Sequence, residues 1–267
     1  MSGTKTMLAA FAALMMPGLA AVGAASAQES GDLLQQIIDR GTVRLCTAAL
    51  APWEFKDPTT GEWMGYNPDL ARDFAEAINV EIEWVEAQWG TAIAALQANQ
   101  CDIGWAAFAR TPQRALAVEF VDPHFVFGNF IAVAADNEAV KTYEDLNNPD
   151  VIFAVRPDFS EVLIKEFFPN AQIRVIQSDN PDAPRLEVRA GRADAVVDDG
   201  PTFAEFMRKP GSDWLKVVDL PPLTANGASW FLRPGNQRLL NFLNTFLEYQ
   251  KEQGRIEELT EKWMSFN

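Results

Sequence analysis

Segments with a strand-like pattern alternate with segments of helical period along most of this chain. Val80, Ile82 and Trp84, for example, alternate with acidic residues, as in a strand with one buried face. Strands that alternate with helices are typical of parallel α/β sheets, in which crossover helices join the strands. Because the alternation occurs in two runs of about a hundred residues each, it predicts an α/β protein with two lobes.

The individual elements follow from short apolar runs and their spacing. The predicted strands are 43–46, 80–84, 102–106, 151–155, 173–176 and 193–197. The predicted helices cover 33–38, 70–78, 93–96, 160–168, 182–191 and, with a break near Gly254, 239–263. A cluster of turn residues at 57–61 predicts a hairpin within 55–66.

Two of the helix starts carry cap residues. Asn67 is expected to cap a helix whose first residue is Pro68. Thr111 is expected to cap a helix begun by Pro112, which would place Arg114 in its first turn. Helix-end amides and a guanidinium at such a position can together hold a carboxylate.

The composition excludes several classes of partner. The 267 residues include 37 acidic and 22 basic side chains, which gives a net charge of −15. This charge repels phosphate backbones and anionic lipids, so nucleic-acid and membrane-surface roles are disfavoured. With one His and two Cys, the chain is poor in the usual ligands of a metal site. We therefore expect no nucleic acid, metal or cofactor, and we expect His124 to be a packed or hydrogen-bonded residue rather than a base.

The N-terminus has the pattern of an exported protein. Lys5 precedes a run of apolar and small residues over 7–24, and Ala25-Ser26-Ala27 follows as a cleavage site. The pattern predicts a signal peptide over 1–27 and a mature chain of 28–267 in the periplasm. A transmembrane anchor of minimum length is the alternative.

The two cysteines allow two interpretations. Outside the cytoplasm, Cys46 and Cys101 can form a disulfide. Cysteine is also among the residue types most often buried, so two separate core thiols are an equally supported alternative. Whether they pair depends on the distance between them, which the sequence does not give.

Three side chains in the predicted loops offer complementary chemistry. Ligands of doubly wound sheets bind beyond the carboxyl ends of the strands. Near these ends, Arg114 presents a planar fork to a carboxylate, Asp199 can pair with an ammonium, and Trp89 offers an aromatic face. Together they describe a site for an amino acid. The simpler alternatives are an ion pair of Arg114 with Glu119 or Asp122, a surface acid pair of Asp198 and Asp199, and core packing of Trp89.

A set of short motifs runs through the whole mature chain. In order, they are Gly41-Thr42-Val43-Arg44-Leu45, Pro52-Trp53-Glu54-Phe55, Gly65-Tyr66-Asn67-Pro68-Asp69-Leu70-Ala71, Trp89 to Gln97, Asp102-Ile103, Thr111-Pro112-Gln113-Arg114, Phe120 to Pro123, Gly191-Arg192-Ala193-Asp194-Ala195 and Lys262-Trp263. In this order and spacing the chain resembles family 3 of the extracellular solute-binding proteins, which serve ABC-type uptake of polar amino acids. The resemblance implies a non-enzymatic, monomeric protein that captures an amino acid or similar small carboxylate and delivers it to a membrane permease.

The resemblance also implies a fold. It is the two-lobed type II fold of periplasmic binding proteins, in which each lobe is a doubly wound sheet and a two-strand hinge joins them. Lobe one would comprise 28–133 and 225–267, and lobe two 134–224, with hinge strands at about 130–137 and 222–231. Because the ligand contacts both lobes, its binding would favour the closed form.

Residue roles follow from the same resemblance. It implies that Arg114 binds the ligand carboxylate, that Asp199 binds the amino group, and that Trp89 packs on the ligand side chain. The other expected ligand contacts are Thr47, Leu50, Ala109, Thr111, Arg156 and Phe159.

Several of these positions depart from the family pattern. Thr47 stands where an acid is usual, Leu50 where an aromatic is common, and Asp158-Phe159 where relatives often have Gly-Thr. The ligand class therefore stays open between two alternatives. Arg156 and Arg110 could admit a second acidic group, whereas the aromatic residues Trp53, Trp89, Trp105 and Phe159 could suit an aromatic or cationic ligand by stacking.

A lyase is the alternative function. Some relatives on this scaffold resemble cyclohexadienyl dehydratases, whose elimination reaction needs a proton donor close to the leaving hydroxyl. In this chain Thr202 stands near the place where such a carboxylate is expected, and the glycine-rich loop of those relatives is absent at 157–160. The binding function is therefore favoured.

Overall fold

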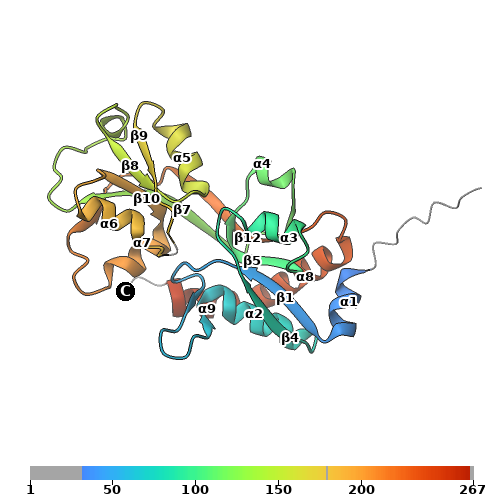
Figure 1. The fold of residues 1–267 in the computed structure, drawn as a ribbon. Coiled ribbons are helices and arrows are strands. Elements are labelled where there is room, and N and C mark those ends of the chain that lie inside the picture. The colour runs from blue at the N-terminus through green and yellow to red at the C-terminus, as the bar shows by residue number, and fades with distance from the viewer. Residues whose placement is uncertain (1–31, 179, 265–267) are drawn as a thin grey trace, which may run out of the picture. The chain divides into compact units, whose positions relative to one another are not determined.

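The computed structural model describes residues 32–178 and 180–264, whose fold is drawn in Figure 1. The predicted signal peptide, 1–27, lies outside the described residues. In the part of the chain that is described, no helix is long and apolar enough to cross a membrane.

Helices and strands alternate as the sequence pattern predicts. The helices are α1 (Leu33–Arg40), α2 (Tyr66–Ala77), α3 (Ala92–Gln97), α4 (Pro112–Ala115), α5 (Phe159–Phe167), α6 (Ala183–Arg189), α7 (Gly200–Met207), α8 (Gln237–Glu252) and α9 (Arg255–Met264), with a 3-10 turn at Glu144–Leu146. The strands are β1 (Thr42–Thr47), β2 (Phe55–Lys56), β3 (Trp63–Met64), β4 (Glu81–Glu86), β5 (Ile103–Ala109), β6 (Glu119–Phe120), β7 (Phe125–Ala134), β8 (Ile152–Val155), β9 (Gln172–Val175), β10 (Ala195–Asp199), β11 (Leu215–Val217) and β12 (Thr224–Leu232). Strands β2 and β3 form the predicted hairpin.

One continuous sheet runs through both halves of the fold. Its strand order is β4-β1-β5-β12-β7-β10-β8-β9, with β6 paired to β12 and β11 paired to β7. Strand β1 is parallel to β4 and β5, and β8 is parallel to β9 and β10. The long strands β7 and β12 pair antiparallel between these two parallel parts (Figure 1). They overlap both ranges expected for the hinge strands.

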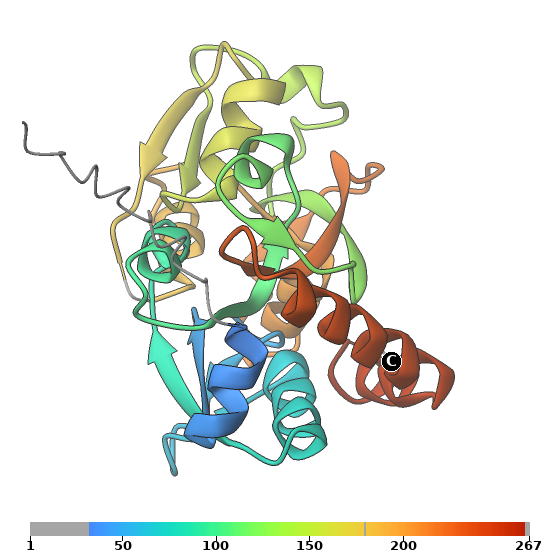
Figure 2. The ribbon, with the colours of Figure 1, turned by 90° about the vertical axis from the view of Figure 1, so that its right-hand side faces the viewer.

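Buried apolar side chains form separate cores on the two parallel parts. One core packs β1 and β5 against α2, α8 and α9, and includes Phe74, Leu243 and Leu259. The other packs β7, β8 and β10 against α5, and includes Phe153 and Leu163. We call the parts around these cores the first and the second lobe. In Figure 2 the red helices α8 and α9 lie beside the blue α1 and cyan α2, so residues late in the chain complete the first lobe.

The expected cap of α2 was wrong. The helix begins two residues earlier, at Tyr66, and Gly65 occupies the cap position without a side-chain hydrogen bond. Asn67 is fully buried instead, where its amide nitrogen donates to Glu54 Oε2 at 2.5 Å and its amide oxygen accepts from Trp230 Nε1 at 3.0 Å. These long-range partners satisfy its amide group, so it is not available to the first turn of the helix.

A disulfide joins Cys46 and Cys101, which resolves the open question about the two cysteines. Cys46 lies on β1, and Cys101 lies just before β5, the neighbouring parallel strand. Their Cα atoms are 5.6 Å apart, within the range that a disulfide spans. The bond therefore links two paired strands of the first lobe, within a separate buried cluster that includes Leu96 and Phe231.

Removing this disulfide is expected to destabilise the protein. In the variant Cys46→Ala with Cys101→Ala, we expect the free energy of unfolding to fall by roughly 4 kcal/mol, because the bond closes a loop across 55 residues and so restricts the unfolded chain. Urea denaturation of the oxidised protein and of the double variant measures the difference. Equal unfolding midpoints would contradict the prediction.

Candidate functional site

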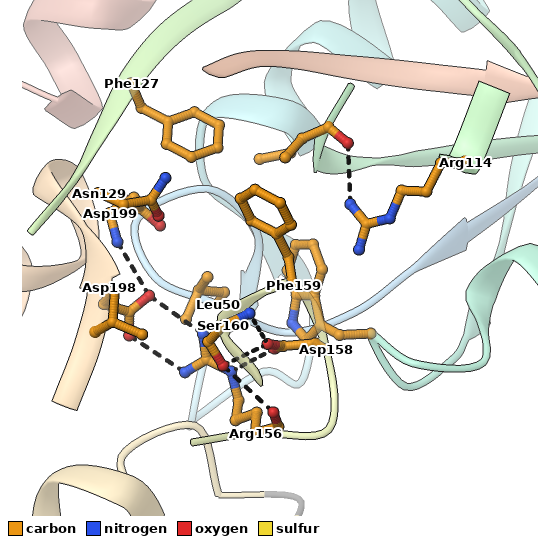
Figure 3. A pocket seen from close by; sticks show the side chains of 14 residues that line it. Leu50, Arg114, Phe127, Asn129, Arg156, Asp158, Phe159, Ser160, Asp198 and Asp199 are labelled. Carbon is orange, nitrogen blue, oxygen red and sulfur yellow. Dashed lines mark hydrogen bonds and ion pairs between the residues drawn. The ribbon is translucent and has the colours of Figure 1, made fainter. Parts of the chain in front are cut away.

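A cavity lies between the two lobes, at the carboxyl ends of β1, β5, β8 and β10 (Figure 3). Its volume is about 60 Å³. Both lobes contribute to its wall. The lining residues are Leu50, Trp89, Ala107, Ala109, Arg114, Phe127, Asn129, Arg156, Asp158, Phe159, Ser160, Val197, Asp198 and Asp199.

The lobes touch each other around this cavity. A Cβ atom on Gly90 would lie only 2.5 Å from the carbonyl oxygen of Pro157, so the two loops leave no room for a side chain there. Phe159 packs against the cores of both lobes. On the far side of the cavity, Trp53 Nε1 of the first lobe donates to Asp199 Oδ1 of the second at 3.0 Å. Contacts between the lobes therefore border the cavity.

Arg114 reaches the cavity from the first turn of α4. As predicted, Thr111 caps this helix, because its hydroxyl accepts from the Arg114 backbone amide at 3.2 Å. The guanidinium lies between the rings of Phe108 and Phe159, at 5.1 and 5.5 Å from their centres, and Nη1 donates to the Ala109 carbonyl at 2.9 Å. Burial lowers the pKa of Arg114 from its ordinary value, although Asp158 partly offsets this effect.

Within residues 32–178 and 180–264, Arg114 forms no ion pair. The alternative of an ion pair with Glu119 or Asp122 was therefore wrong. The side chain keeps its positive charge under all relevant conditions, since arginine is not deprotonated in proteins. A half-buried arginine without an ion-pair partner is a ready anchor for an anionic ligand group.

Asp199 reaches the cavity from the second lobe, at the end of β10. Its Oδ1 accepts from the Thr202 amide at 2.8 Å, which caps α7, and also from Trp53. Its Oδ2 accepts from the Thr202 hydroxyl at 2.9 Å. Burial and the adjacent charge of Asp198 raise the pKa of Asp199 to about 6. Because Oδ2 receives only one protein hydrogen bond, it can still accept from a ligand ammonium.

Arg156 lines the cavity but is already paired. Its Nε donates to Asp158 Oδ2 at 2.8 Å, and its two terminal nitrogens each lie 3.2 Å from an oxygen of Asp198. Arg185 binds Asp198 as well, at 2.5 Å. Asp158 in turn caps α5 through the Ser160 amide. These contacts hold the loop after β8 against the end of β10.

The structure brings most of the predicted site residues together. Those that line the cavity are Leu50, Trp89, Ala109, Arg114, Arg156, Phe159 and Asp199. Two predicted residues do not line it. Thr47 is fully buried in β1, and Thr111 serves as the cap of α4. The side chain of Arg110, named with Arg156 for a second acidic group, is exposed and also lies outside the cavity wall.

Other lining residues were not among the predicted contacts. Asp158 and Ser160 form a cap pattern, Asp158-Phe159-Ser160, that the sequence displays at the start of α5. Phe127 and Asn129 had no comparable signal. Asn129 reaches the cavity because β7 pairs with β10 in a register that places it opposite Asp199.

The raised pKa of Asp199 predicts a pH effect on stability. Between about pH 4 and pH 6, folded Asp199 retains a proton that the unfolded chain has released, so stability falls as pH rises through this window. Relative to Asp199→Asn, which lacks this titration, the wild-type free energy of unfolding should fall by up to about 3 kcal/mol between pH 4 and pH 7. Chemical denaturation at several pH values measures the two profiles. Parallel profiles would contradict the prediction.

Comparisons with known proteins place the chain in a family. The sequence matches the family model of bacterial extracellular solute-binding proteins, family 3, over residues 43–266. The histidine-binding periplasmic protein of Escherichia coli (strain K12) is 25% identical over 222 residues, which is 81% of this chain and 85% of the relative.

Similar solved structures support the same family. The ancestral amino acid-binding protein AncCDT-1, a precursor of cyclohexadienyl dehydratase, is 36% identical with a TM-score of 0.80, over 88% of this chain and 100% of that one. An ancestral arginine-binding protein bound to arginine is 30% identical with a TM-score of 0.76, over 85% and 99%. These similarities confirm the predicted two-lobed α/β fold. The chain therefore belongs to family 3 of the bacterial extracellular solute-binding proteins.

Proposed function

We propose that this protein is the periplasmic substrate-binding component of an ABC uptake system and that it captures an α-amino acid in the cavity between its lobes. The observation that carries the proposal is the placement of Arg114 and Asp199 on the same cavity, one from each lobe. One presents a cation and the other a carboxylate, as the two ends of an α-amino acid require. Relatives with histidine- and arginine-binding names support the ligand class.

We propose one role for each side chain. The Arg114 fork receives the ligand carboxylate, and the rings of Phe108 and Phe159 hold the guanidinium in place. Asp199 Oδ2 accepts from the ligand ammonium, while Trp53 and Thr202 fix the orientation of the carboxyl group. Both charges of the ligand are then paired away from water, where such pairs are strongest.

The lobes close on the ligand by a hinge. We place lobe one at 28–133 and 225–267 and lobe two at 134–224, with β7 and β12 as the connection. Because Arg114 and Asp199 belong to different lobes, a ligand that binds both favours the closed arrangement. The close approach of Gly90 to Pro157 supports a closed form with tight contact between the loops.

The cellular setting follows from the family and the N-terminal pattern. We propose that residues 1–27 are a signal peptide, that the mature protein acts in the periplasm, and that it works as a monomer with a membrane permease as its partner. The histidine-binding relative of E. coli is periplasmic by name.

We infer that the protein is not an enzyme. A dehydratase needs a proton donor at the leaving group. Burial and Asp198 raise the pKa of Asp199 to about 6, while hydrogen bonds from Trp53 and Thr202 oppose this rise. At neutral pH Asp199 is therefore mostly a carboxylate, which accepts rather than donates. His124, the single histidine, does not line the cavity, and burial lowers its pKa to about 3.

Loss of Arg114 is expected to abolish ligand binding. A thermal-shift screen of the wild type against the standard α-amino acids should give at least one stabilising ligand, worth about 2.7 kcal/mol at a hundred times its dissociation constant. Arg114→Ala should show no shift with that ligand, because the carboxylate loses its cation. The matched control is Arg110→Ala, since Arg110 lies four positions earlier and outside the cavity wall. Normal binding by Arg114→Ala would overturn the site.

Dehydratase activity is expected to be absent. Incubation of the wild type with prephenate or arogenate should yield no aromatic product above that of a buffer control. Product that disappears in Asp199→Asn would instead identify Asp199 as an acid and contradict the proposal.

A further inference from the structure

The second arginine of the cavity is already paired with two carboxylates of the protein. All three nitrogens of the Arg156 guanidinium point at carboxylate oxygens, Nε at Asp158 and the two terminal nitrogens at Asp198 (Figure 3). The three side chains are mostly buried, with exposed fractions of 14% for Arg156, 7% for Asp158 and 6% for Asp198. Burial alone would raise the pKa of Asp158, but Arg156 and Ser160 bring it below its ordinary value.

Arg185, which does not line the cavity, supplies a second positive charge beside Asp198. It is 2% exposed, and its guanidinium lies over the rings of Phe203 and Phe206, at 5.5 and 5.0 Å. From there it binds Asp198 Oδ2 at 2.5 Å. Two guanidinium groups thus face the two carboxylates of Asp158 and Asp198. On its outer side Arg185 also binds Asp182, which binds Lys209. The network therefore has three basic and three acidic side chains and carries no net charge.

The remaining charges in the cavity wall are one of each sign. Outside the network, the charged lining residues are Arg114 and Asp199. They match a ligand with one carboxylate and one ammonium. A second ligand carboxylate would be buried beside a neutral network, with no free cation to pair with, and burial of such a charge is strongly unfavourable.

We propose that Asp158 is a specificity-determining residue: by holding Arg156, it excludes acidic side chains, so that the cavity takes monocarboxylic amino acids and rejects dicarboxylic acids. This inference rests on the proposed function. The sequence left open whether Arg156 admits a second acidic group of the ligand. The proposal excludes such a group. Loss of the Asp158 charge leaves the network with one excess positive charge at the cavity wall.

The variant Asp158→Asn isolates the charge of this residue. Asp158 also caps α5, since its Oδ1 accepts from the Ser160 amide at 2.8 Å and from the Ser160 hydroxyl at 2.6 Å. Asparagine is an equally good cap, so the helix keeps its start while the charge is lost. The matched control is Asp182→Asn. Asp182 binds Arg185 at 2.6 Å on the outer side of the network and does not line the cavity.

The test measures thermal stabilisation and calorimetric affinity for glutamate, and for glutarate, which has two carboxylates and no amino group. We expect neither compound to stabilise the wild type or Asp182→Asn. Asp158→Asn should bind both, with an affinity about ten- to hundredfold above the wild type, the gain expected from a hydrogen bond to a charged group.

Each outcome decides the inference. Dicarboxylate binding by Asp158→Asn alone supports it. Equal or absent dicarboxylate binding in the wild type and Asp158→Asn overturns it, and so does an equal gain in Asp182→Asn. The proposed function is tested separately, by the stabilisation of the wild type with neutral and basic amino acids. A failure of the proposed function therefore shows in the wild type alone, without the variants.

Discussion

The antiparallel pairing of β7 with β12 is the contact on which the site depends. These strands run in register from Thr224 opposite Asn129 to Ala228 opposite Phe125. On its other side β12 pairs with β5, which leads to α4, and β7 pairs with β10, which ends at Asp199. One pair of strands therefore positions both Arg114 and Asp199, the two charged residues of the proposed site. Asn129 reinforces this pair, because its amide donates to the Thr224 hydroxyl at 2.9 Å.

Sequence patterns predicted those elements whose structure depends on residues close together in the chain. Alternation of apolar and acidic residues gave β4, and the cap residue Thr111 with Pro112 gave the start of α4 and so the position of Arg114. The rule that ligands bind at the carboxyl ends of parallel strands pointed to Arg114, Trp89 and Asp199. The other predicted residues of the cavity wall came from the family resemblance. The order of motifs supplied the family and, with it, the two-lobed arrangement that periodicity alone only suggested.

Contacts between residues that are far apart in the chain could not be predicted from the sequence. Nothing local shows that Asn67 bonds to Glu54 and Trp230 rather than to its own helix, or that Asp158 and Asp198 neutralise Arg156. The same holds for the disulfide, because pairing depends on the distance between β1 and β5. In each case the partner is set by the packing of separate elements, which a one-dimensional pattern does not contain.

The composition of the first lobe has a consequence for folding during synthesis. Its core combines side chains from 33–127 with others from 228–264, among them Leu243, Leu259 and Met264. The core of the second lobe comes instead from one continuous segment within 130–218. Since contacts between distant residues form only after the intervening chain exists, the lobe that starts first is completed last. Until α8 and α9 have been added, β1 and β5 lack part of their apolar cover, so the first lobe exposes apolar surface that the second lobe has already buried.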